Sequence, residues 1–507
     1  MSDIDIQPRD EHNARLIGNT HPPGWQNPQP RALYDLVVIG GGTAGLVSAA
    51  GAAGLGAKVA LVERHLLGGD CLNFGCVPSK ALLRAARAAY DVAAAGTFGV
   101  HAASLTIDFS AVMQRMRRLR ADISRHDSAE RFAGLGVDLF LGQARYSGPQ
   151  TVEVAGATLR FKRSILATGS RAAVPGVPGL GGASCLTNET VFSLSELPRR
   201  LTIVGGGPIG CELAQAFRRF GSEVTIVQRG PRLMPKDEPA AAELIQQRFE
   251  QEGIAVLLNA NLVRAAVSAS GKQLTVEVAG RELLVEADAV LVAAGRAPNV
   301  EGLELAAAGV SANVKGVEVN DFLQTANPRI YAAGDIAGSF QFTHAADAMA
   351  RICLQNAFFS FAGLGRQRLS NLVVPWTTYT DPEVAHVGLT AAAAAEQGIA
   401  IDTYREDLSH VDRAMLDGET EGFAVIHVRK GTPRVVGCTI VARHAGEMIG
   451  EISLLMSGGL TLADLARTIH CYPTQVEVLK RLGDQYQKSR LTPRAAWLLR
   501  TIIGWRR

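Results

Sequence analysis

The chain has 507 residues, of which 47% are hydrophobic, so it can bury several cores and is expected to form two to four domains. Its 51 basic and 48 acidic residues leave a net charge of +3, which excludes the strongly basic composition of a nucleic-acid-binding protein. Seven cysteines are too few for a disulfide scaffold, and neither a secretory signal nor a membrane-spanning apolar run is seen, so we expect a cytoplasmic protein with small-molecule partners.

The first part of the chain has a leader and a nucleotide-binding pattern. Residues 1–33 are rich in proline and polar side chains and are predicted to be an extended leader. In "YDLVVIGGGTAGLVSAAGAAGLGAKVALVE" an apolar strand meets the glycines of a GxGxxG fingerprint, which are Gly40, Gly42 and Gly45. A helix and a second strand ending at Glu63 follow, as in a βαβ unit that binds a dinucleotide. The glycines admit a pyrophosphate to the helix N-terminus, and a carboxylate on the ribose favours FAD.

The pattern recurs in "LTIVGGGPIGCELAQAFRRFGSEVTIVQR". Its fingerprint glycines are Gly205, Gly207 and Gly210. Gln228 stands where Glu63 ends the first unit, and Arg229 and Arg232 follow it. Loss of the carboxylate and gain of cations favour the 2′-phosphate of NADPH, while NADH remains the alternative if the arginines are ordinary surface cations. The chain is therefore predicted to hold two dinucleotide sites.

Two cysteines lie close together in "GGDCLNFGCVPSK". Four residues separate Cys71 from Cys76, enough for the chain to curl back and close a disulfide, and Pro78 suits the first turn of a following helix. A helix N-terminus and the charge of Lys80 would lower the pKa of the Cys76 thiol. The pattern indicates a reactive dithiol; two buried structural thiols or half of a zinc site are the alternatives.

Three further segments complete the organisation. The basic stretch "MQRMRRLRADISRHD" is interpreted as the solvated face of a helix. The segments "ILATGS", "AAGRAPN" and "RIYAAGDIAG" read as strands that end in glycine turns, and from about Val373 the pattern indicates a separate α+β domain. The last stretch, "RLTPRAAWLLRTIIGWRR", alternates apolar residues with arginines, which suggests docking on a membrane surface, on a protein partner or on its own dimer.

Taken in order, these motifs resemble those of the class I pyridine nucleotide-disulfide oxidoreductases, which include lipoamide dehydrogenase, glutathione reductase and mercuric reductase. The resemblance implies an α/β fold with two Rossmann-like dinucleotide-binding domains and a C-terminal α+β dimerisation domain (glutathione reductase-like). The implied domains are a leader (1–33), an FAD-binding domain with its central part (34–175 and 299–372), an NAD(P)H-binding domain (176–298), a dimerisation domain (373–490) and an amphipathic basic tail (491–507).

The resemblance also assigns roles to residues. Cys71 would meet the substrate, Cys76 would form the charge-transfer contact with the flavin, and Lys80 would lie near flavin N5, paired with Glu212. Asp335 would hold the FAD ribityl chain, and a homodimer partner would complete each active site. Other cofactor contacts are expected from Gly69, Asp70, Thr168, Gly169, Gly295 and Gly334. Many members of the family have threonine at the Asp70 position.

The motif "HCYPTQVE" departs from the disulfide reductases of this family. They have His-Pro-Thr-x-x-Glu, in which the imidazole protonates the departing thiolate and the glutamate orients it. Here Tyr472 replaces the histidine, and a phenol is a poor base at neutral pH. The counterpart of the glutamate is Glu477. Mercuric reductases carry tyrosine at this position and a histidine two residues earlier, where His470 stands.

Two parts of mercuric reductase are absent from the sequence. The C-terminal cysteine pair is not seen, since the last cysteine is Cys471, and the N-terminal metal-binding domain is not seen, since the leader has no cysteine. Cys71, Cys76, Cys471 and Tyr472 are the candidate metal-binding residues. The sequence predicts that electrons pass from NADPH through FAD and the dithiol to a metal ion or a disulfide. The alternatives are a dihydrolipoamide dehydrogenase-like enzyme and a redox subunit or sensor that docks to a partner.

Overall fold

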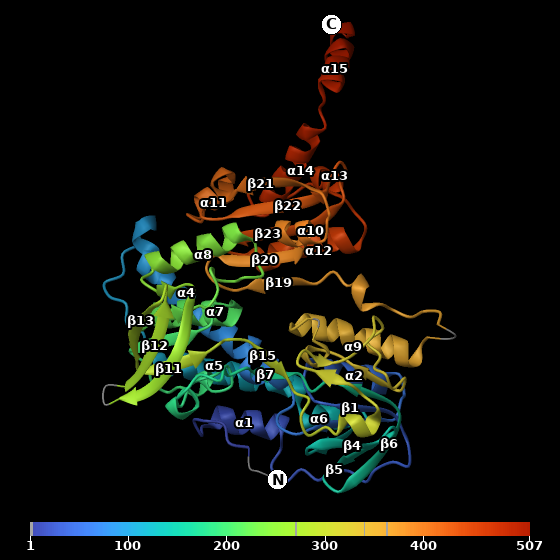
Figure 1. Cartoon of the computed structure of the whole chain (residues 1–507). Coiled ribbons are helices and arrows are strands. Elements are labelled where there is room, and N and C mark those ends of the chain that lie inside the picture. Colours follow the sequence, from blue (N-terminus) through green and yellow to red (C-terminus); the bar gives the residue numbers. More distant parts are fainter. Residues whose placement is uncertain (1–3, 269–270, 339, 361–362, 507) are drawn as a thin grey trace. The chain divides into compact units, whose positions relative to one another are not determined.

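The chain folds into two compact units in the computed structural model, which describes residues 4–268, 271–338, 340–360 and 363–506 (Figure 1). Unit 1 comprises Met1–Arg229 and Gly253–Leu372, and unit 2 comprises Gly230–Glu252 and Val373–Arg507. No helix in the described ranges is both long and apolar enough to cross a membrane.

The first sheet of unit 1 is a parallel sheet extended by an antiparallel meander. Its strands lie in the order β3-β2-β1-β6-β5-β4, and β18 pairs with β6. The strand bounds are β1 (Tyr34–Ile39), β2 (Val59–Glu63), β3 (Asp138–Leu141), β4 (Ala144–Gly148), β5 (Thr151–Val154), β6 (Ala157–Leu166) and β18 (Ile330–Ala332). β1 pairs in parallel with both β2 and β6, and β2 pairs in parallel with β3.

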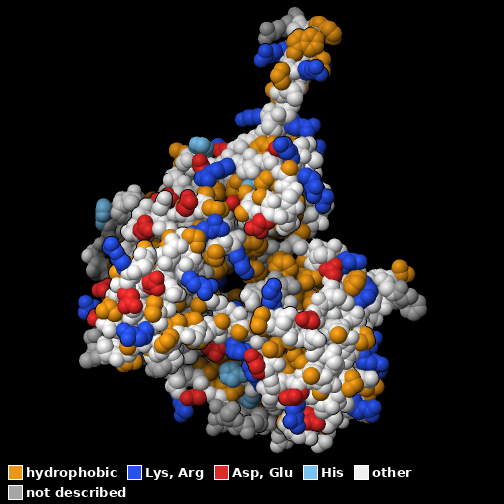
Figure 2. Space-filling view, viewed as in Figure 1, with side chains coloured by type: hydrophobic (Ala, Val, Ile, Leu, Met, Phe, Trp, Pro, Cys, Tyr) orange, Lys and Arg blue, Asp and Glu red, His pale blue; other side chains and the backbone are white. Residues whose placement is uncertain are grey.

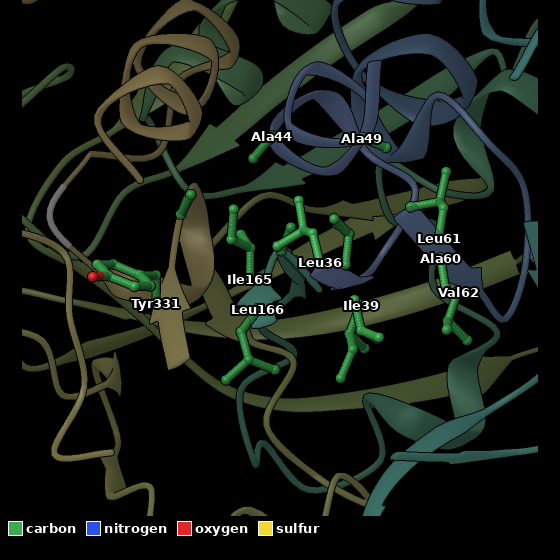
Figure 3. Close-up of a cluster of buried hydrophobic side chains, with 14 of the residues drawn as sticks. Leu36, Ile39, Ala44, Ala49, Ala60, Leu61, Val62, Ile165, Leu166 and Tyr331 are labelled. Atoms are coloured by element: carbon green, nitrogen blue, oxygen red, sulfur yellow. The ribbon is translucent and has the colours of Figure 1, made fainter. Parts of the chain in front are cut away.

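The core of this sheet explains its apolar strand sequences. Every residue of β2 is buried, as a strand covered on both faces requires. Helix α2 (Thr43–Gly54) packs small side chains such as Ala44 and Ala49 toward Leu36 and Ile165 of the strands (Figure 3). Small helix residues let α2 lie close to the carboxyl ends of β1 and β6, where the first glycine fingerprint begins.

A second parallel sheet in unit 1 repeats the arrangement. Its order is β10-β9-β8-β14, and the bounds are β8 (Arg200–Val204), β9 (Glu223–Val227), β10 (Ala255–Leu257) and β14 (Ala289–Val292). Helix α7 (Pro208–Phe220) connects β8 to β9. An antiparallel sheet of β11 (Ala260–Ser268), β12 (Gly271–Val278) and β13 (Arg281–Ala287) adjoins it in sequence, and β7 (Ser170–Ala172) pairs with β15 (Arg296–Pro298). Both predicted Rossmann-like units are therefore present.

Unit 2 is built on an antiparallel sheet covered by helices. The strand order is β19-β20-β23-β22-β21, with β19 (Pro375–Thr378), β20 (Glu383–Gly388), β21 (Ile401–Asp407), β22 (Phe423–Arg429) and β23 (Val435–Ala442). Its helices include α8 (Pro239–Gln251), α12 (Ala445–Ser457), α13 (Leu462–Arg467), α14 (Glu477–Ser489) and α15 (Pro493–Trp505). This is the α+β domain that the sequence predicts.

Helix α8 lies within the predicted limits 176–298 of the NAD(P)H-binding domain, but it groups with unit 2. Two hydrogen bonds at the start of α8 explain this. The indole N–H of Trp376 donates to Asp237 at 2.8 Å, and the His427 ring nitrogen lies 2.9 Å from a Glu238 oxygen. Both carboxylates are buried, so they hold the start of α8 on the sheet of unit 2.

The leader is partly helical, so the prediction of an extended segment is wrong for residues 11–20. Helix α1 (Glu11–Thr20) is capped by Asp10 and buries Leu16 and Asn13. Asn13 accepts a 2.7 Å hydrogen bond from Arg120, which is only 1% exposed. Buried polar groups need partners, and α1 supplies one for this guanidinium.

Helix α5 (Phe109–Ser124) is only partly the solvated basic face expected from its sequence, because Arg115 and Arg118 are exposed but Arg117 and Arg120 are buried. Arg120 donates a second bond, at 2.7 Å, to the carbonyl of Asn73, and Arg117 pairs with Asp10 at 2.5 Å. Burial lowers the pKa of Arg120 to about 10. Asn73 lies in α3 (Gly69–Phe74), the helix that carries Cys71. Arg120 of α5 therefore links α1 to the helix of the first cysteine.

Candidate functional site

The two glycine fingerprints form nearly identical loops. Gly42 and Gly207 are the N-caps of α2 and α7, and neither helix start has a side-chain cap. A Cβ on Gly45 would lie 1.8 Å from the Gly40 carbonyl oxygen, and one on Gly210 would lie 2.0 Å from that of Gly205. Only glycine fits at these positions, and the uncapped N–H groups remain free to bind a pyrophosphate.

The side chains that end the second strands also match. Glu63 accepts the N–H of Gly41 at 2.5 Å, and Gln228 accepts the N–H of Gly206 at 2.9 Å. Burial raises the pKa of Glu63, and its hydrogen bonds to Gly41 and His65 oppose this. Gln228 therefore keeps the backbone contact of Glu63 without its charge.

The arginines after Gln228 differ in their surroundings. Arg229 is exposed and ends the first stretch of unit 1, whereas Arg232 belongs to unit 2. Arg232 donates to the carbonyl of Pro235 at 2.7 Å. Arg229 is therefore the arginine that belongs to the same unit as the second glycine loop.

The two cysteines come together at the ends of consecutive helices. Cys71 lies in α3, and Cys76 is the first residue of α4 (Cys76–Ala94). Both thiols are free and are hydrogen-bonded to each other. The Cys76 sulfur also lies 3.5 Å from the Thr343 hydroxyl, at the first residue of α9 (Thr343–Phe358). Cys76 thus sits at one helix N-terminus and contacts the first residue of another.

This geometry separates the acidities of the two thiols. The hydrogen bond from Cys71, and then the charge of Lys80 and the bond from Thr343, lower the pKa of Cys76. The same pairing, together with burial, raises the pKa of Cys71. Helix N-termini favour a thiolate as well. Cys76 is therefore the thiol that ionises first.

Lys80 and Glu212, which are far apart in sequence, meet as the motifs predict. The Lys80 ammonium lies 2.8 Å from a Glu212 oxygen, and the Glu212 side chain is 6% exposed. Glu212 belongs to α7, the helix of the second glycine fingerprint. The ion pair therefore joins the dithiol helix to the second nucleotide-binding unit within unit 1.

Asp70 belongs to a charged network that sequence reasoning did not find. Its carboxylate lies 3.2 Å from the guanidinium of Arg296 and accepts a 2.8 Å hydrogen bond from Asn188. Arg296 also lies 3.5 Å from Asp335. Burial raises the pKa of Asp70, and Arg296 opposes it. The only signal in the sequence was the aspartate itself, where the family usually has threonine.

The remaining cofactor-site predictions fall in turns held by specific bonds. Thr168 donates to the Asn299 carbonyl at 2.8 Å, and Asn299 donates back to the Thr168 carbonyl at 2.9 Å. Ser170 donates to Asp335 at 2.5 Å. Gly69, Gly169, Gly295 and Gly334 all have a positive φ, which favours glycine. Thr343, Arg296, Asn188 and Ser170 are site residues that the sequence alone did not single out.

The C-terminal candidates belong to unit 2. Tyr472 is 73% exposed, and its hydroxyl donates to Asp412 at 2.8 Å, which raises the pKa of the phenol. His470 is buried against Glu451 at 3.0 Å. Cys471 is exposed. Glu477 pairs with Arg481 one turn along α14 at 3.0 Å.

The four candidate metal-binding residues are divided between the two units. In the described ranges, no group of three or more His, Cys, Asp and Glu side chains is arranged to hold a metal ion. Cys71 and Cys76 lie together in unit 1, and Cys471 and Tyr472 belong to unit 2.

The fold, the paired glycine loops and the dithiol define a class of flavin-dependent oxidoreductases. A family model described as pyridine nucleotide-disulphide oxidoreductase matches residues 34–350, and the dimerisation domain of that family matches residues 374–482. The chain belongs to this family. The predicted family and glutathione reductase-like fold are therefore confirmed, FAD and NAD(P)H are its cofactors, and the dimerisation domain supports a homodimer.

Its relatives differ in activity. The chain is 37% identical over 456 residues to a mercuric reductase of Lysinibacillus sphaericus, covering 90% of this chain and 83% of that one. It is 35% identical over 459 residues to a dihydrolipoyl dehydrogenase of Chlorobaculum tepidum, covering 89% and 96%. The Cu(II) complex of the HOCl-induced flavoprotein disulfide reductase RclA from Escherichia coli superposes with a TM-score of 0.78 at 27% identity, covering 88% and 98%. Identity does not single out one acceptor.

Proposed function

We propose that this chain passes electrons from NADPH, through FAD and the Cys71–Cys76 dithiol, to a thiophilic metal ion such as Hg(II). The net reaction is NADPH plus Hg(II) to NADP⁺, a proton and Hg(0), so the two electrons of the nicotinamide reduce one metal ion. Two neighbouring sulfurs are the ligands that a soft metal prefers.

The chain has a suitable cradle for both nucleotides. The uncapped N-termini of α2 and α7 would hold the two pyrophosphates, Glu63 would bind the FAD ribose, and Asp335 would bind the ribityl chain. When bound, FAD supplies two-electron transfer between the nicotinamide and the disulfide. Arg229, beside the uncharged Gln228, favours the 2′-phosphate of NADPH over NADH.

One observation carries the choice of a metal acceptor: Tyr472 replaces the imidazole that a disulfide reductase needs. Its hydroxyl donates to Asp412 at 2.8 Å, so the pKa of the phenol is raised further from neutrality. A group that stays protonated cannot take the proton of an attacking thiol. A metal ion bound by two thiolates leaves no thiolate product that needs a general acid.

A disulfide acceptor is the second candidate, favoured by the relatives named as dihydrolipoyl dehydrogenase and flavoprotein disulfide reductase. In that reading, water or another side chain replaces the imidazole. The Cu(II) complex of the structural relative makes Cu(II) a second metal to test beside Hg(II).

The test is an anaerobic titration of the purified holoenzyme with NADPH, followed by Hg(II), Cu(II) or a panel of disulfides. We expect the long-wavelength thiolate–flavin band on two-electron reduction, its loss in Cys76→Ser, and sustained NADPH oxidation with Hg(II). Sustained turnover with a small disulfide but not with the metals would reject the proposal in favour of the second candidate.

A further inference from the structure

The helix at the C-terminal end of unit 2 is apolar but covered by nothing in the described chain. Helix α15 has no buried residue, and its large apolar side chains are between 39% and 84% exposed (Figures 1 and 2). These side chains are Trp497, Leu498, Leu499, Ile502, Ile503 and Trp505. Exposure of so much apolar surface to water is unfavourable, so α15 is expected to bind an apolar partner.

The helix begins by its own local signals rather than by packing. The Thr492 hydroxyl accepts the N–H of Ala495 at 3.2 Å, and Pro493 occupies the first turn, where its missing N–H costs nothing. Its 13 residues make a rod about 20 Å long, which is too short to cross a bilayer but long enough to lie along its surface.

The charge of this segment has a single sign. No acidic residue follows Asp484 in the sequence, whereas six basic residues do. They are Lys488, Arg490, Arg494, Arg500, Arg506 and Arg507. None of the five that lie in the described ranges forms an ion pair there. The segment therefore offers uncompensated positive charge to an anionic surface.

The faces of α15 suit a membrane interface. At 3.6 residues per turn, Leu498, Ile502 and Trp505 lie on one side with Leu499 and Ile503 beside them. Arg500 lies opposite with Trp497 beside it, and Arg494 lies one turn before Leu498, at the start of the apolar side. Tryptophan is favoured at the boundary between headgroups and acyl chains, and arginine stems reach along apolar surface to the phosphates.

We infer that α15 binds the surface of an anionic lipid bilayer and holds the homodimer at a membrane. An anionic nucleic acid would use the arginines but leave the aliphatic side chains in water, and an acidic protein groove would use the arginines without needing two tryptophans. The apolar, basic and tryptophan content together match a charged lipid interface best. This inference does not depend on which acceptor the enzyme reduces.

The test uses flotation of the full-length holoenzyme with vesicles of phosphatidylcholine alone or of phosphatidylcholine with phosphatidylglycerol. We expect binding to the anionic vesicles to be at least about tenfold stronger and to weaken with salt. The variant Arg494→Gln/Arg500→Gln/Arg506→Gln should lose most of this binding. The matched control removes three exposed arginines elsewhere, by Arg118→Gln/Arg264→Gln/Arg281→Gln, and should bind like the wild type.

Two further measurements keep the outcome clear. Trp497→Ser/Trp505→Ser should lower binding to the anionic vesicles without changing the charge, and NADPH-driven flavin reduction without vesicles should be unchanged in all of these variants. Equal binding by the tail and control arginine variants would overturn the inference. So would dissociation of the homodimer on deletion of residues 492–507, because α15 would then pack on its own dimer.

Discussion

Removal of the Lys80 charge should raise the pKa of the Cys76 thiol. Lys80 lies one turn along α4 from Cys76, so the two groups are roughly 6 Å apart. At an effective dielectric of about 20, one charge at this distance contributes about 3 kcal/mol, or about two pKa units.

Solvent screening reduces this effect, because the Lys80 side chain is 36% exposed. We therefore expect Lys80→Met to raise the pKa of Cys76 by about one unit, a tenfold loss of thiolate at a pH below the pKa. The variant loses the cation and leaves a buried carboxylate uncompensated, so both changes act in the same direction.

The assay is the absorbance of the thiolate–flavin band in the two-electron-reduced enzyme, titrated anaerobically from about pH 5 to pH 9. The pKa of Cys76 is lowered in the wild type, so its band persists toward low pH, and the midpoint should move upward in Lys80→Met. Arg84→Met removes an exposed cation one turn further along α4 and should leave the midpoint unchanged.

Glu212→Gln gives the opposite sign and is the sharper test. Loss of the carboxylate leaves the Lys80 charge unopposed, so the midpoint of the Cys76 titration should move downward. If both variants moved it in the same direction, or neither moved it, the electrostatic account of the thiolate would be wrong.

Three further predictions concern other parts of the chain. Gln228→Glu keeps the backbone contact but adds a charge against a 2′-phosphate, so kcat/KM for NADPH should fall at least about tenfold relative to NADH, as measured by steady-state kinetics with both nucleotides. Asn13→Ala removes the partner of the buried Arg120 and should lower the free energy of unfolding by about 2 kcal/mol in denaturant titrations, whereas Asn13→Asp should cost less. Burial raises the pKa of Asp237 to about 6, so the free energy of unfolding should fall as pH rises through that value. Asp237→Asn still accepts the hydrogen bond from Trp376, so it should raise Tm at about pH 8 but not near pH 4. An equal change in Tm at both pH values would contradict the predicted direction of the pH dependence.

The glycine loops could be predicted from the sequence because their constraints are local. A carbonyl lies 1.8 Å from where the Cβ of residue 45 would be, and a strand, a loop and a helix follow one another within residues 34–54 around it. The same holds for Cys76 at the start of a helix. Where a few adjacent residues determine the backbone, their order in the chain is enough.

The leader and the Asp70 network could not be predicted because their partners are distant in sequence. Composition alone made α1 look extended, since most of its residues are polar and Leu16 is its one fully buried aliphatic residue. Its burial depends on Arg120, more than a hundred residues away, which the sequence presents as one of many surface arginines. Asp70 likewise pairs with Arg296, which lies more than two hundred residues away in β15, the strand that pairs with β7.

The division of the chain into two units explains why overall identity leaves the acceptor open. Unit 1 carries both glycine loops, the dithiol and the Lys80–Glu212 pair, which in our proposal bring electrons from NADPH to the acceptor. The residues that distinguish metal from disulfide acceptors in our proposal, Tyr472 and its neighbours, are a handful in unit 2. Sequence identity averaged over several hundred positions depends mostly on the many residues of unit 1. It changes very little with the few residues around Tyr472. The substitution Tyr472→His therefore tests this explanation. It should raise the turnover of small disulfides and leave NADPH-driven flavin reduction unchanged. A fall in both rates would show that electron delivery and the choice of acceptor do not depend on separate sets of residues.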